Sequence, residues 1–440
     1  MADPDVSSRM RRDWNARARE DAGYYVAFGR RDQDDEGFFA TAAEVIKGLE
    51  WELRRVPQAQ RANWRALEIG CGPGRLMRPM SAHFAELHGV DVSDDMIALA
   101  KDKLREVSNA HPHSTDGASL SLFEDDFFDF VYSYAVFQHI PSREVVEQYF
   151  HEIRRVLKPG GFARLQINGL PRGTENAFDT WSGARFSGLE ILDFTRANDL
   201  QVLALEGTST QYMWTTWRKR PRGWQQEQNI RADLGLIPPA LRIRRITNAN
   251  SSEPVAPSSG RFASISIWVE HLPEAAGLHH LRVVIGDALG AVTYIGPPDN
   301  VGLQQLNVLL PEMGGTGLLP VEIRWLDHAI APRATLRVIP PGPSVPRVYS
   351  ITDGVNLIAG ARIETRSVKL TIEEISHPDE IEASIGGHLV EGLEFFCIDP
   401  RPQRFEVNFR LPEALPPGTH ALQLRIGRRK LAPIPLEVVA

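Results

Sequence analysis

The chain has 440 residues, of which 42% are hydrophobic, and its formal net charge is −7 at neutral pH. This length predicts two to four domains with ordinary cores. The acidic balance argues against nucleic acid as the main partner, because phosphate binding needs clustered Lys and Arg. No apolar run is long enough to span a membrane, and the charged N-terminal residues do not resemble a secretion signal. We therefore expect no membrane contact and a cytoplasmic location. The only cysteines, Cys71 and Cys397, predict neither a disulfide framework nor a metal site.

Secondary structure in the first half alternates between helices and strands. Apolar residues recur at helical spacing over residues 10–53. Strands and helices then alternate from Arg65 to about Gly169, which predicts a parallel sheet covered on both faces. Two adjoining strands are expected over residues 200–206 and 212–217. The segment Lys158-Pro159-Gly160-Gly161 is expected to end a helix and turn the chain.

A glycine-rich segment is the most informative local feature. Residues 66–76 read Ala-Leu-Glu-Ile-Gly-Cys-Gly-Pro-Gly-Arg-Leu, an apolar run that leads into glycines at positions 70, 72 and 74. Since glycine has no Cβ, it can adopt positive φ and bring backbone N–H groups close to a bound molecule. The pattern predicts a buried strand, a ligand-binding loop and then a helix from Arg75 to Ser81.

Two acidic residues indicate which ligand this loop binds. The run over residues 88–93 predicts a second strand that ends at Asp91, where a carboxylate can accept hydrogen bonds from both hydroxyls of a ribose. Glu68 precedes the first glycine. A carboxylate there disfavours a pyrophosphate but favours a cofactor with an ammonium and a sulfonium. An oxidoreductase that uses a nicotinamide cofactor is the less favoured alternative.

The segment Glu68–Gly74 resembles motif I of class I S-adenosylmethionine-dependent methyltransferases. Four later segments resemble further motifs of this family in the same order: Asp91-Val92-Ser93 with Met96, Thr115-Asp116-Gly117, Phe128 to Ile140, and Arg154 to Gly161. The resemblance covers about the first half of the chain.

This resemblance implies a doubly wound, Rossmann-like α/β domain of the small-molecule methyltransferase type over residues 1–222. A helical lid would cover the cofactor from about residues 1–60. The cofactor would be S-adenosyl-L-methionine, and its implied binding residues are Glu68, Gly70, Cys71, Gly72, Gly74, Asp91, Val92, Met96, Asp116, Gly117 and Tyr134. For Asp116, ordinary Asp-Gly turn chemistry is the alternative.

His139 is the candidate catalytic residue. It follows the fourth predicted strand at the carboxyl edge of the sheet, where open α/β folds bind ligands. Its imidazole could take a proton from an acceptor hydroxyl. The alternative is that His139 caps the next helix or packs beneath Ile140 and Pro141. The acceptor is expected to be a small molecule, such as a metabolite or glycan hydroxyl, and the insert over residues 170–187 is expected to help form its pocket.

Beyond Arg222 the pattern changes to short alternating stretches bounded by glycine and proline, which predict antiparallel strands. Leu310-Pro311-Glu312 recurs about 100 residues later as Leu411-Pro412-Glu413. We predict two all-β, immunoglobulin-like sandwich domains at residues 241–340 and 345–440, joined by a proline-rich linker. Their expected role is to form a homo-oligomer or to bind a protein or glycan. A scaffold that binds the cofactor while the repeats bind a partner is a further alternative.

Overall fold

The computed structural model describes residues 4–439 except 28–33, 172–178, 182, 237–240, 343–344, 356–359, 376 and 400–402. The chain falls into two compact units, one formed by Met1–Ala22 with Asp35–Pro341 and the other by Gly23–Asp34 with Gly342–Ala440. No described helix is long and apolar enough to cross a membrane.

The described part of the N-terminal region is mainly helical, as predicted, and residues 28–33 of the predicted range 10–53 lie outside the described residues. It comprises α1 (Pro4–Ala27), α2 (Asp35–Ala40) and α3 (Ala43–Leu53). Helix α1 is interrupted at Asp21, whose φ of −168° and ψ of 89° are not helical. In α3, Ile46, Leu49 and Leu53 are buried at spacings of three and four residues, and these side chains form its apolar face.

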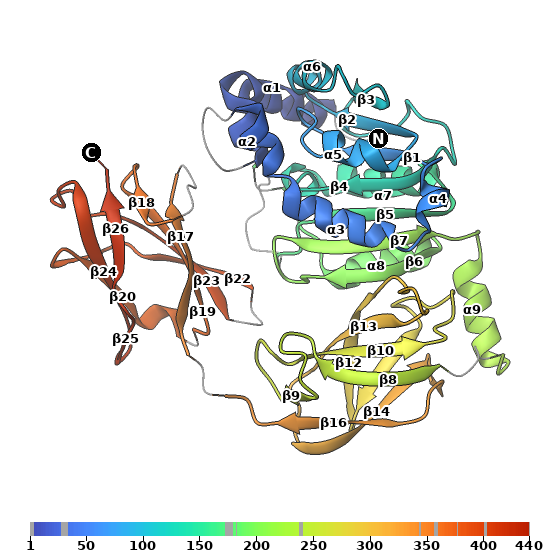
Figure 1. Ribbon diagram of the computed structural model, residues 1–440. Helices are drawn as coiled ribbons and strands as arrows, with labels where there is room; N and C mark the ends of the chain where they lie inside the picture. Colours follow the sequence, from blue (N-terminus) through green and yellow to red (C-terminus); the bar gives the residue numbers. More distant parts are fainter. Residues whose placement is uncertain are drawn as a thin grey trace. The chain divides into compact units, whose positions relative to one another are not determined.

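A seven-stranded sheet follows and confirms the doubly wound, Rossmann-like prediction (Figure 1). Its strands are β1 (Arg65–Ile69), β2 (Glu86–Asp91), β3 (Ala110–Ser114), β4 (Phe128–Ser133), β5 (Leu157–Ile167), β6 (Leu200–Glu206) and β7 (Met213–Lys219). Their order is β3-β2-β1-β4-β5-β7-β6. The first five strands are parallel, whereas β7 is antiparallel to both of its neighbours. The order reverses between β1 and β4, where open sheets of this kind bind ligands.

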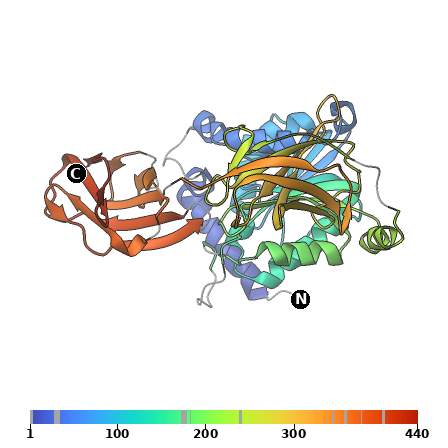
Figure 2. The same cartoon turned by 90° about the horizontal axis from the view of Figure 1, so that it is seen from below.

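Helices cover both faces of this sheet (Figures 1 and 2). The remaining helical elements of the first unit are α4 (Gln58–Arg61), α5 (Met77–Met80), η1 (Ser81–His83), α6 (Asp94–Lys103), η2 (Phe137–His139), α7 (Arg143–Val156), α8 (Gly188–Ala197) and α9 (Trp224–Asp233). Two adjacent residues of β7 identify the faces. Thr216 donates a hydrogen bond to Glu52 on α3, whereas the Trp217 ring packs against Phe150 on α7 and Phe194 on α8. Since neighbouring side chains of a strand point to opposite faces, α3 lies on one face and α7 and α8 lie on the other.

One local prediction is wrong. Lys158 to Gly161 do not turn the chain after a helix but lie within β5, as a bulge. Phe128 pairs with Leu157, and the next paired residue, Phe130, pairs with Phe162. Gly160 has a φ of 85°, which glycine adopts without strain, so the extra residues bend the strand without ending it.

The first β-sandwich consists of two sheets around a shared core. Its strands are β8 (Arg242–Asn248), β9 (Val255–Pro257), β10 (Ser264–Glu270), β11 (Leu281–Ile285), β12 (Ala288–Ile295), β13 (Gln304–Leu309), β14 (Gly317–Trp325), β15 (His328–Ala329) and β16 (Ala334–Ile339). One sheet has the order β8-β10-β13-β12 and the other β12-β11-β14-β16-β9. Strand β12 belongs to both sheets, and buried residues such as Ile267, Val283 and Ile323 fill the core.

This sandwich is joined directly to the Rossmann-like sheet. Tyr294 of β12 pairs with Ala204 of β6, and the Leu278 N–H donates to the Val202 carbonyl over 2.9 Å. The side-chain amide of Gln201 donates to two carbonyl oxygens of the sandwich. The first compact unit, Met1–Ala22 with Asp35–Pro341, thus spans most of residues 1–222 and all of residues 241–340, which the sequence predicts as two domains. The physical reason is that β6 is an edge strand whose backbone groups need partners.

The second unit repeats the strand order of the first sandwich. Its strands are β17 (Arg347–Asp353), β18 (Arg362–Ile363), β19 (Ser367–Glu373), β20 (Ile381–Ile385), β21 (His388–Leu389), β22 (Glu394–Asp399), β23 (Arg404–Arg410), β24 (Gly418–Ile426), β25 (Arg429–Lys430) and β26 (Ile434–Val438), with the turn η3 (Pro378–Glu380). They form the sheets β17-β19-β23-β22 and β18-β26-β24-β20-β21 around one core. Asn248 and the buried Asp353 end corresponding strands and accept hydrogen bonds from backbone N–H groups, Asn248 from Asn250 and Ser251 and Asp353 from Val355 and Glu364. The internal repeat is therefore structural as well as sequential.

Two buried histidines join the first sandwich to the helices of the Rossmann-like domain. His279 Nε2 lies 3.1 Å from the Thr195 hydroxyl on α8, and His280 Nε2 lies 2.9 Å from the Gln225 side-chain nitrogen on α9. Burial lowers the pKa of His279 to about 3 and that of His280 to about 4, from an ordinary value of 6.5. Both rings are therefore neutral in the folded protein at neutral pH.

We expect these two rings to destabilise the protein in acid. As the pH falls below 6.5, the two imidazoles bind protons in the unfolded chain but stay neutral in the folded protein. The free energy of unfolding is therefore highest above this pH. It decreases toward pH 4 by about 1.4 kcal/mol per pH unit for each ring. Urea unfolding at stepped pH tests this against the double variant His279→Gln, His280→Gln. A variant with the same pH slope as the wild type would contradict it.

Candidate functional site

The glycine loop follows β1 and has a backbone that only glycine adopts without strain. Gly70, Gly72 and Gly74 have φ values of 71°, 51° and 85°. A Cβ on Gly70 would lie 2.2 Å from Val136 Cγ2, and one on Gly74 would lie 2.8 Å from Leu104 Cδ1. Larger residues are therefore excluded by both conformation and space. The strand and loop predicted for this segment are both present.

Asp91 lies at the end of β2, beside this loop. Its Oδ2 accepts a hydrogen bond from the Gly72 N–H and its Oδ1 accepts one from the Ser93 N–H, each over 2.9 Å. Burial raises the pKa of this carboxyl group, and the hydrogen bonds from Ser93 and Gly72 oppose the rise. Because each carboxylate oxygen can accept a second hydrogen bond, Asp91 can hold the loop and still receive a ligand hydroxyl.

Glu68 and Cys71 are buried next to the loop. Glu68 is 3% exposed, and its Oε2 accepts a hydrogen bond from the Tyr132 hydroxyl over 2.9 Å. Burial raises the pKa of Glu68 to about 8. Burial also raises the pKa of the Cys71 thiol, so this group stays protonated and is a packing group rather than a nucleophile.

The predicted adenine segment is assembled around the start of α6. Ser93 caps this helix by accepting a hydrogen bond from the Met96 N–H, and Met96 is buried. Gly117 has a φ of 78°, and a Cβ there would lie 2.5 Å from Val92 Cγ2 and 3.3 Å from Met10 Cε. The structure thus brings Val92 and Gly117 together, as the resemblance implies.

Asp116 forms a turn. Its Oδ1 accepts hydrogen bonds from the Ala118 and Ser119 N–H groups, and its Oδ2 accepts one from the Ser119 hydroxyl. These hydrogen bonds lower the pKa of Asp116 against the effect of burial. The carboxylate therefore forms an Asp-Gly turn, and its contact with a cofactor stays a prediction.

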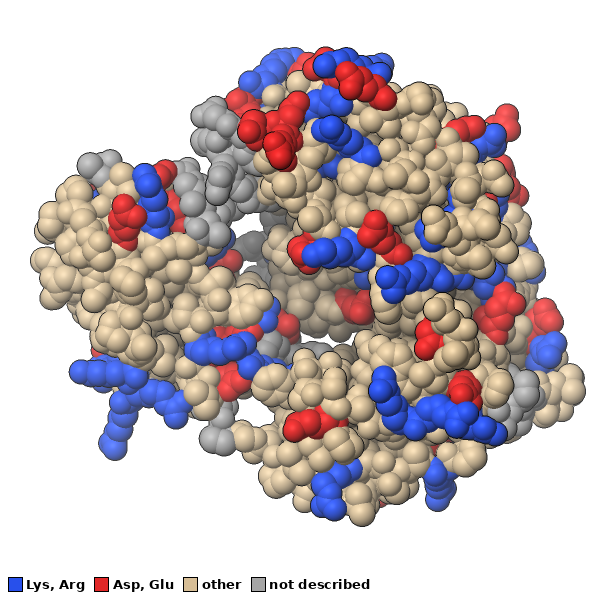
Figure 3. Space-filling model, in the orientation of Figure 1, with Lys and Arg blue, Asp and Glu red and all other residues tan. Residues whose placement is uncertain are grey.

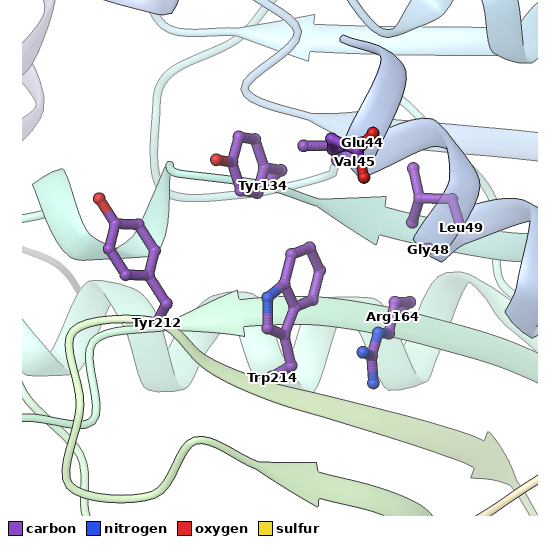
Figure 4. Close-up of a pocket in the computed structure, with 8 residues that line it drawn as sticks. All are labelled: Glu44, Val45, Gly48, Leu49, Tyr134, Arg164, Tyr212 and Trp214. Carbon is purple, nitrogen blue, oxygen red and sulfur yellow. The ribbon is translucent and has the colours of Figure 1, made fainter. Parts of the chain in front are cut away.

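Tyr134 lines a cavity of about 370 Å³ that sequence reasoning missed (Figure 4). The other lining residues are Glu44, Val45, Gly48, Leu49, Arg164, Tyr212 and Trp214. The Tyr134 and Trp214 rings stack at a centroid distance of 5.7 Å, and the Arg164 guanidinium lies 4.8 Å from the Trp214 ring centroid. Arg164 forms an ion pair with Glu206 over 3.1 Å. The period-two spacing of Tyr212 and Trp214 was the available signal, because it places both rings on one face.

His139 is buried at the end of η2, with 5% of its surface exposed. Its Nδ1 donates to the Trp181 carbonyl over 3.0 Å, and its Nε2 lies 3.3 Å from the Gln138 amide nitrogen. The ring packs edge-on against Trp14, with the centroids 5.4 Å apart. Burial lowers the pKa of His139 to about 4, so the imidazole is neutral at pH 7. Residues 172–178 and 182 of the predicted acceptor insert lie outside the described residues, and Phe186 of the same insert is buried.

The first part of α1 lies against the site. Arg11 donates to Asp94 over 2.9 Å and to the Thr115 carbonyl over 2.6 Å. The Ser93 hydroxyl donates to the Asn15 side chain over 2.6 Å. These bonds fix α1 over the ends of β2 and β3, where the predicted adenine segment lies.

The surface charge is mixed, whereas the site contains buried charges. Figure 3 shows Lys and Arg interspersed with Asp and Glu on the visible face. Among the residues that the structure describes, no group of three or more His, Cys, Asp or Glu could hold a metal ion. A glycine loop flanked by the buried Glu68 and the partly buried Asp91 fits an adenosine cofactor that has a cationic end.

Comparison with known protein families supports this interpretation. Residues 67–165 match the family described as "Methyltransferase domain". The chain is 34% identical to phosphoethanolamine N-methyltransferase 2 of Caenorhabditis elegans over 122 residues, which are 27% of this chain and 27% of that protein. It is 28% identical to a ubiquinone biosynthesis O-methyltransferase of Burkholderia vietnamiensis over 170 residues, or 34% of this chain and 69% of that protein.

The chain is also similar to a solved methyltransferase structure. Phosphoethanolamine N-methyltransferase 1 of Haemonchus contortus, in complex with phosphoethanolamine and S-adenosylhomocysteine, is 15% identical with a TM-score of 0.38. That match covers 52% of this chain and 55% of that one. The chain thus spans only part of the length of several of these relatives.

Proposed function

Because residues 67–165 form a class I S-adenosylmethionine-dependent methyltransferase domain, we propose that the chain transfers the methyl group of this cofactor to a small molecule. The contact between Asp91 and the Gly72 N–H carries the proposal, because it joins a ribose acceptor to the glycine loop. Asp91 would bind the ribose, and Glu68 would bind the ammonium. The glycine loop would contribute backbone N–H groups that approach the cofactor, from Gly70, Cys71, Gly72 and Gly74.

The adenine would lie between Val92, Met96 and Gly117, with Asp116 near its amine. Bonds from Arg11 and Asn15 support α1 as part of the proposed helical lid over this end. When bound, the cofactor supplies a methyl group already activated by its sulfonium. The protein's contribution is then mainly to exclude water and align the acceptor.

The cavity beside Tyr134 is the proposed acceptor pocket. Its aromatic rings and the paired Arg164 would suit a flat or apolar molecule with a polar end. A metabolite or glycan hydroxyl is the favoured acceptor. The test is to incubate the full chain with S-adenosylmethionine and panels of phenols, phosphoamines and sugars, and to measure S-adenosylhomocysteine. We expect one panel to stimulate its formation. Cofactor binding without product from any panel would favour the scaffold alternative.

His139 as the base that accepts a hydroxyl proton stays a prediction. Its neutral imidazole can accept a proton, but Nε2 must first separate from the Gln138 amide. If it is the base, His139→Ala lowers kcat by about 100-fold while the affinity for S-adenosylhomocysteine is unchanged. Turnover at the wild-type rate with the native acceptor would exclude this role.

The β-sandwich repeats are proposed to be immunoglobulin-like and to bind a partner or a second copy of the chain. Their shared strand order supports a common module. A cytoplasmic location remains part of this proposal. A nicotinamide-dependent oxidoreductase remains the less favoured alternative, since the buried Glu68 would face a pyrophosphate.

A further inference from the structure

Arg75, directly after the glycine loop, is a buried cation with few partners. Its side chain is 6% exposed. One of its terminal nitrogens lies 3.4 Å from both the carbonyl and the hydroxyl of Thr41, and its Nε has no hydrogen-bond partner. Throughout the described part of the chain, no carboxylate lies within ion-pair distance of this guanidinium.

Other enclosed arginines in the same unit have close acceptors: Arg154, which is also 6% exposed, donates to the backbone carbonyl oxygens of Asn198 and Arg220. Arg55 forms an ion pair with Glu52 over 2.9 Å, and Arg164 forms one with Glu206 over 3.1 Å. An unpaired charge is costly to bury, and burial lowers the pKa of Arg75. Because the Arg75 guanidinium has no carboxylate partner within the described protein, we infer that a ligand supplies one.

The surroundings of Arg75 identify the chemistry of that partner. The guanidinium lies 5.6 Å from the Tyr134 ring centroid, and its charge acts on Glu68 without forming a close ion pair. Among the described residues, the Glu68 side chain is hydrogen-bonded only to the Tyr132 hydroxyl. A buried guanidinium and a buried carboxyl group, whose raised pKa reflects the lack of a close cation, thus flank one glycine loop, and among the described residues neither forms an ion pair. A ligand that carries an ammonium and a carboxylate on one carbon would satisfy both.

We propose that Arg75 binds the carboxylate of the amino-acid end of S-adenosylmethionine, opposite the ammonium site at Glu68. The guanidinium supplies several N–H donors to a carboxylate, so the contact is a charge-assisted hydrogen bond. This inference rests on the proposed function, because it assigns one end of the same cofactor. Arg75 would then contribute to cofactor affinity through the carboxylate alone and not through the ammonium, the sulfonium or the adenosine.

Calorimetry of the full chain with two ligands tests the assignment. S-Adenosylmethionine carries the carboxylate, whereas its decarboxylated analogue keeps the ammonium, the sulfonium and the adenosine. We expect the wild type to bind S-adenosylmethionine about 10- to 100-fold more tightly than the analogue. We expect Arg75→Met to remove this preference while binding of the analogue changes less than about twofold.

Arg78→Met is the matched control, because Arg78 is an exposed arginine three positions further on. It should retain the wild-type preference. Equal affinity of the wild type for both ligands would overturn the proposal even if Arg75→Met did not fold. An equal loss for both ligands in a folded Arg75→Met variant would also overturn it, since it would show a structural role. Failure of the wild type to bind either ligand would instead refute the proposed function.

Discussion

The Asp91→Asn variant is expected to bind S-adenosylhomocysteine about 100-fold more weakly than the wild type. Both Asp91 oxygens accept backbone hydrogen bonds, from Gly72 and from Ser93. The asparagine side chain has only one acceptor oxygen. One of these two N–H groups would therefore face the side-chain NH2 group, which donates and cannot accept its hydrogen bond. The loop would lose its tie to β2, and the ribose would lose a charged acceptor. Since charge-assisted hydrogen bonds contribute about 1.5 to 3 kcal/mol each, the two losses together account for this weakening.

The comparison needs a control with the same chemical change elsewhere. Asp102→Asn serves, because Asp102 is exposed on α6 and its ion pair is with Arg105. Its affinity should match that of the wild type. Circular dichroism would verify that both variants are folded. An Asp91→Asn affinity within threefold of the wild type would contradict the assignment of Asp91 to the ribose.

The second large effect is expected from truncation. A chain that ends at Arg222 should unfold about 10 °C or more below one that ends at Pro341, or should aggregate. Without the first sandwich, the edge of β6 loses its pairing with Tyr294. The buried Glu52 also loses the hydrogen bond that the Tyr294 hydroxyl donates to its Oε1 over 2.9 Å. Glu52 keeps its ion pair with Arg55, and losing one hydrogen bond to a charged group costs about 1.5 to 3 kcal/mol.

Differential scanning calorimetry of the two truncated chains measures this difference. The chain that ends at Pro341 retains the whole sequence of Asp35–Pro341 in the first unit and should keep a transition near that of the full chain. Equal transition temperatures for the two truncated chains would show that the sandwich contributes nothing to the sheet. A Tyr294→Phe variant isolates the hydroxyl and should have a smaller effect than the truncation.

Local patterns were sufficient to predict the glycine loop and the acidic residue beside it. The apolar run before Gly70 and the placement of Asp91 depend only on neighbouring residues, so sequence indicates both the loop and the acid. The repeat of Leu310-Pro311-Glu312 likewise reflects a repeated strand order. These features are local or periodic, and sequence inspection detects them directly.

Other features depend on contacts between distant segments. Tyr294 meets Ala204 at one bridge of an edge strand, and no pattern around either residue identifies the other. The cavity beside Tyr134 combines α3, β5 and β7, and only the folded sheet brings Arg164 and Trp214 together. Arg75 was visible in the motif, but its lack of a charged partner is a property of the folded chain.

The most direct test is a calorimetric titration of the intact chain with S-adenosylmethionine, followed by one with NAD. We predict saturable binding of S-adenosylmethionine at one site per chain, with a dissociation constant on the order of micromolar, and no heat from NAD. A folded protein that gave neither heat nor a thermal shift with S-adenosylmethionine and S-adenosylhomocysteine, or that bound NAD instead, would contradict the assignment of this cofactor.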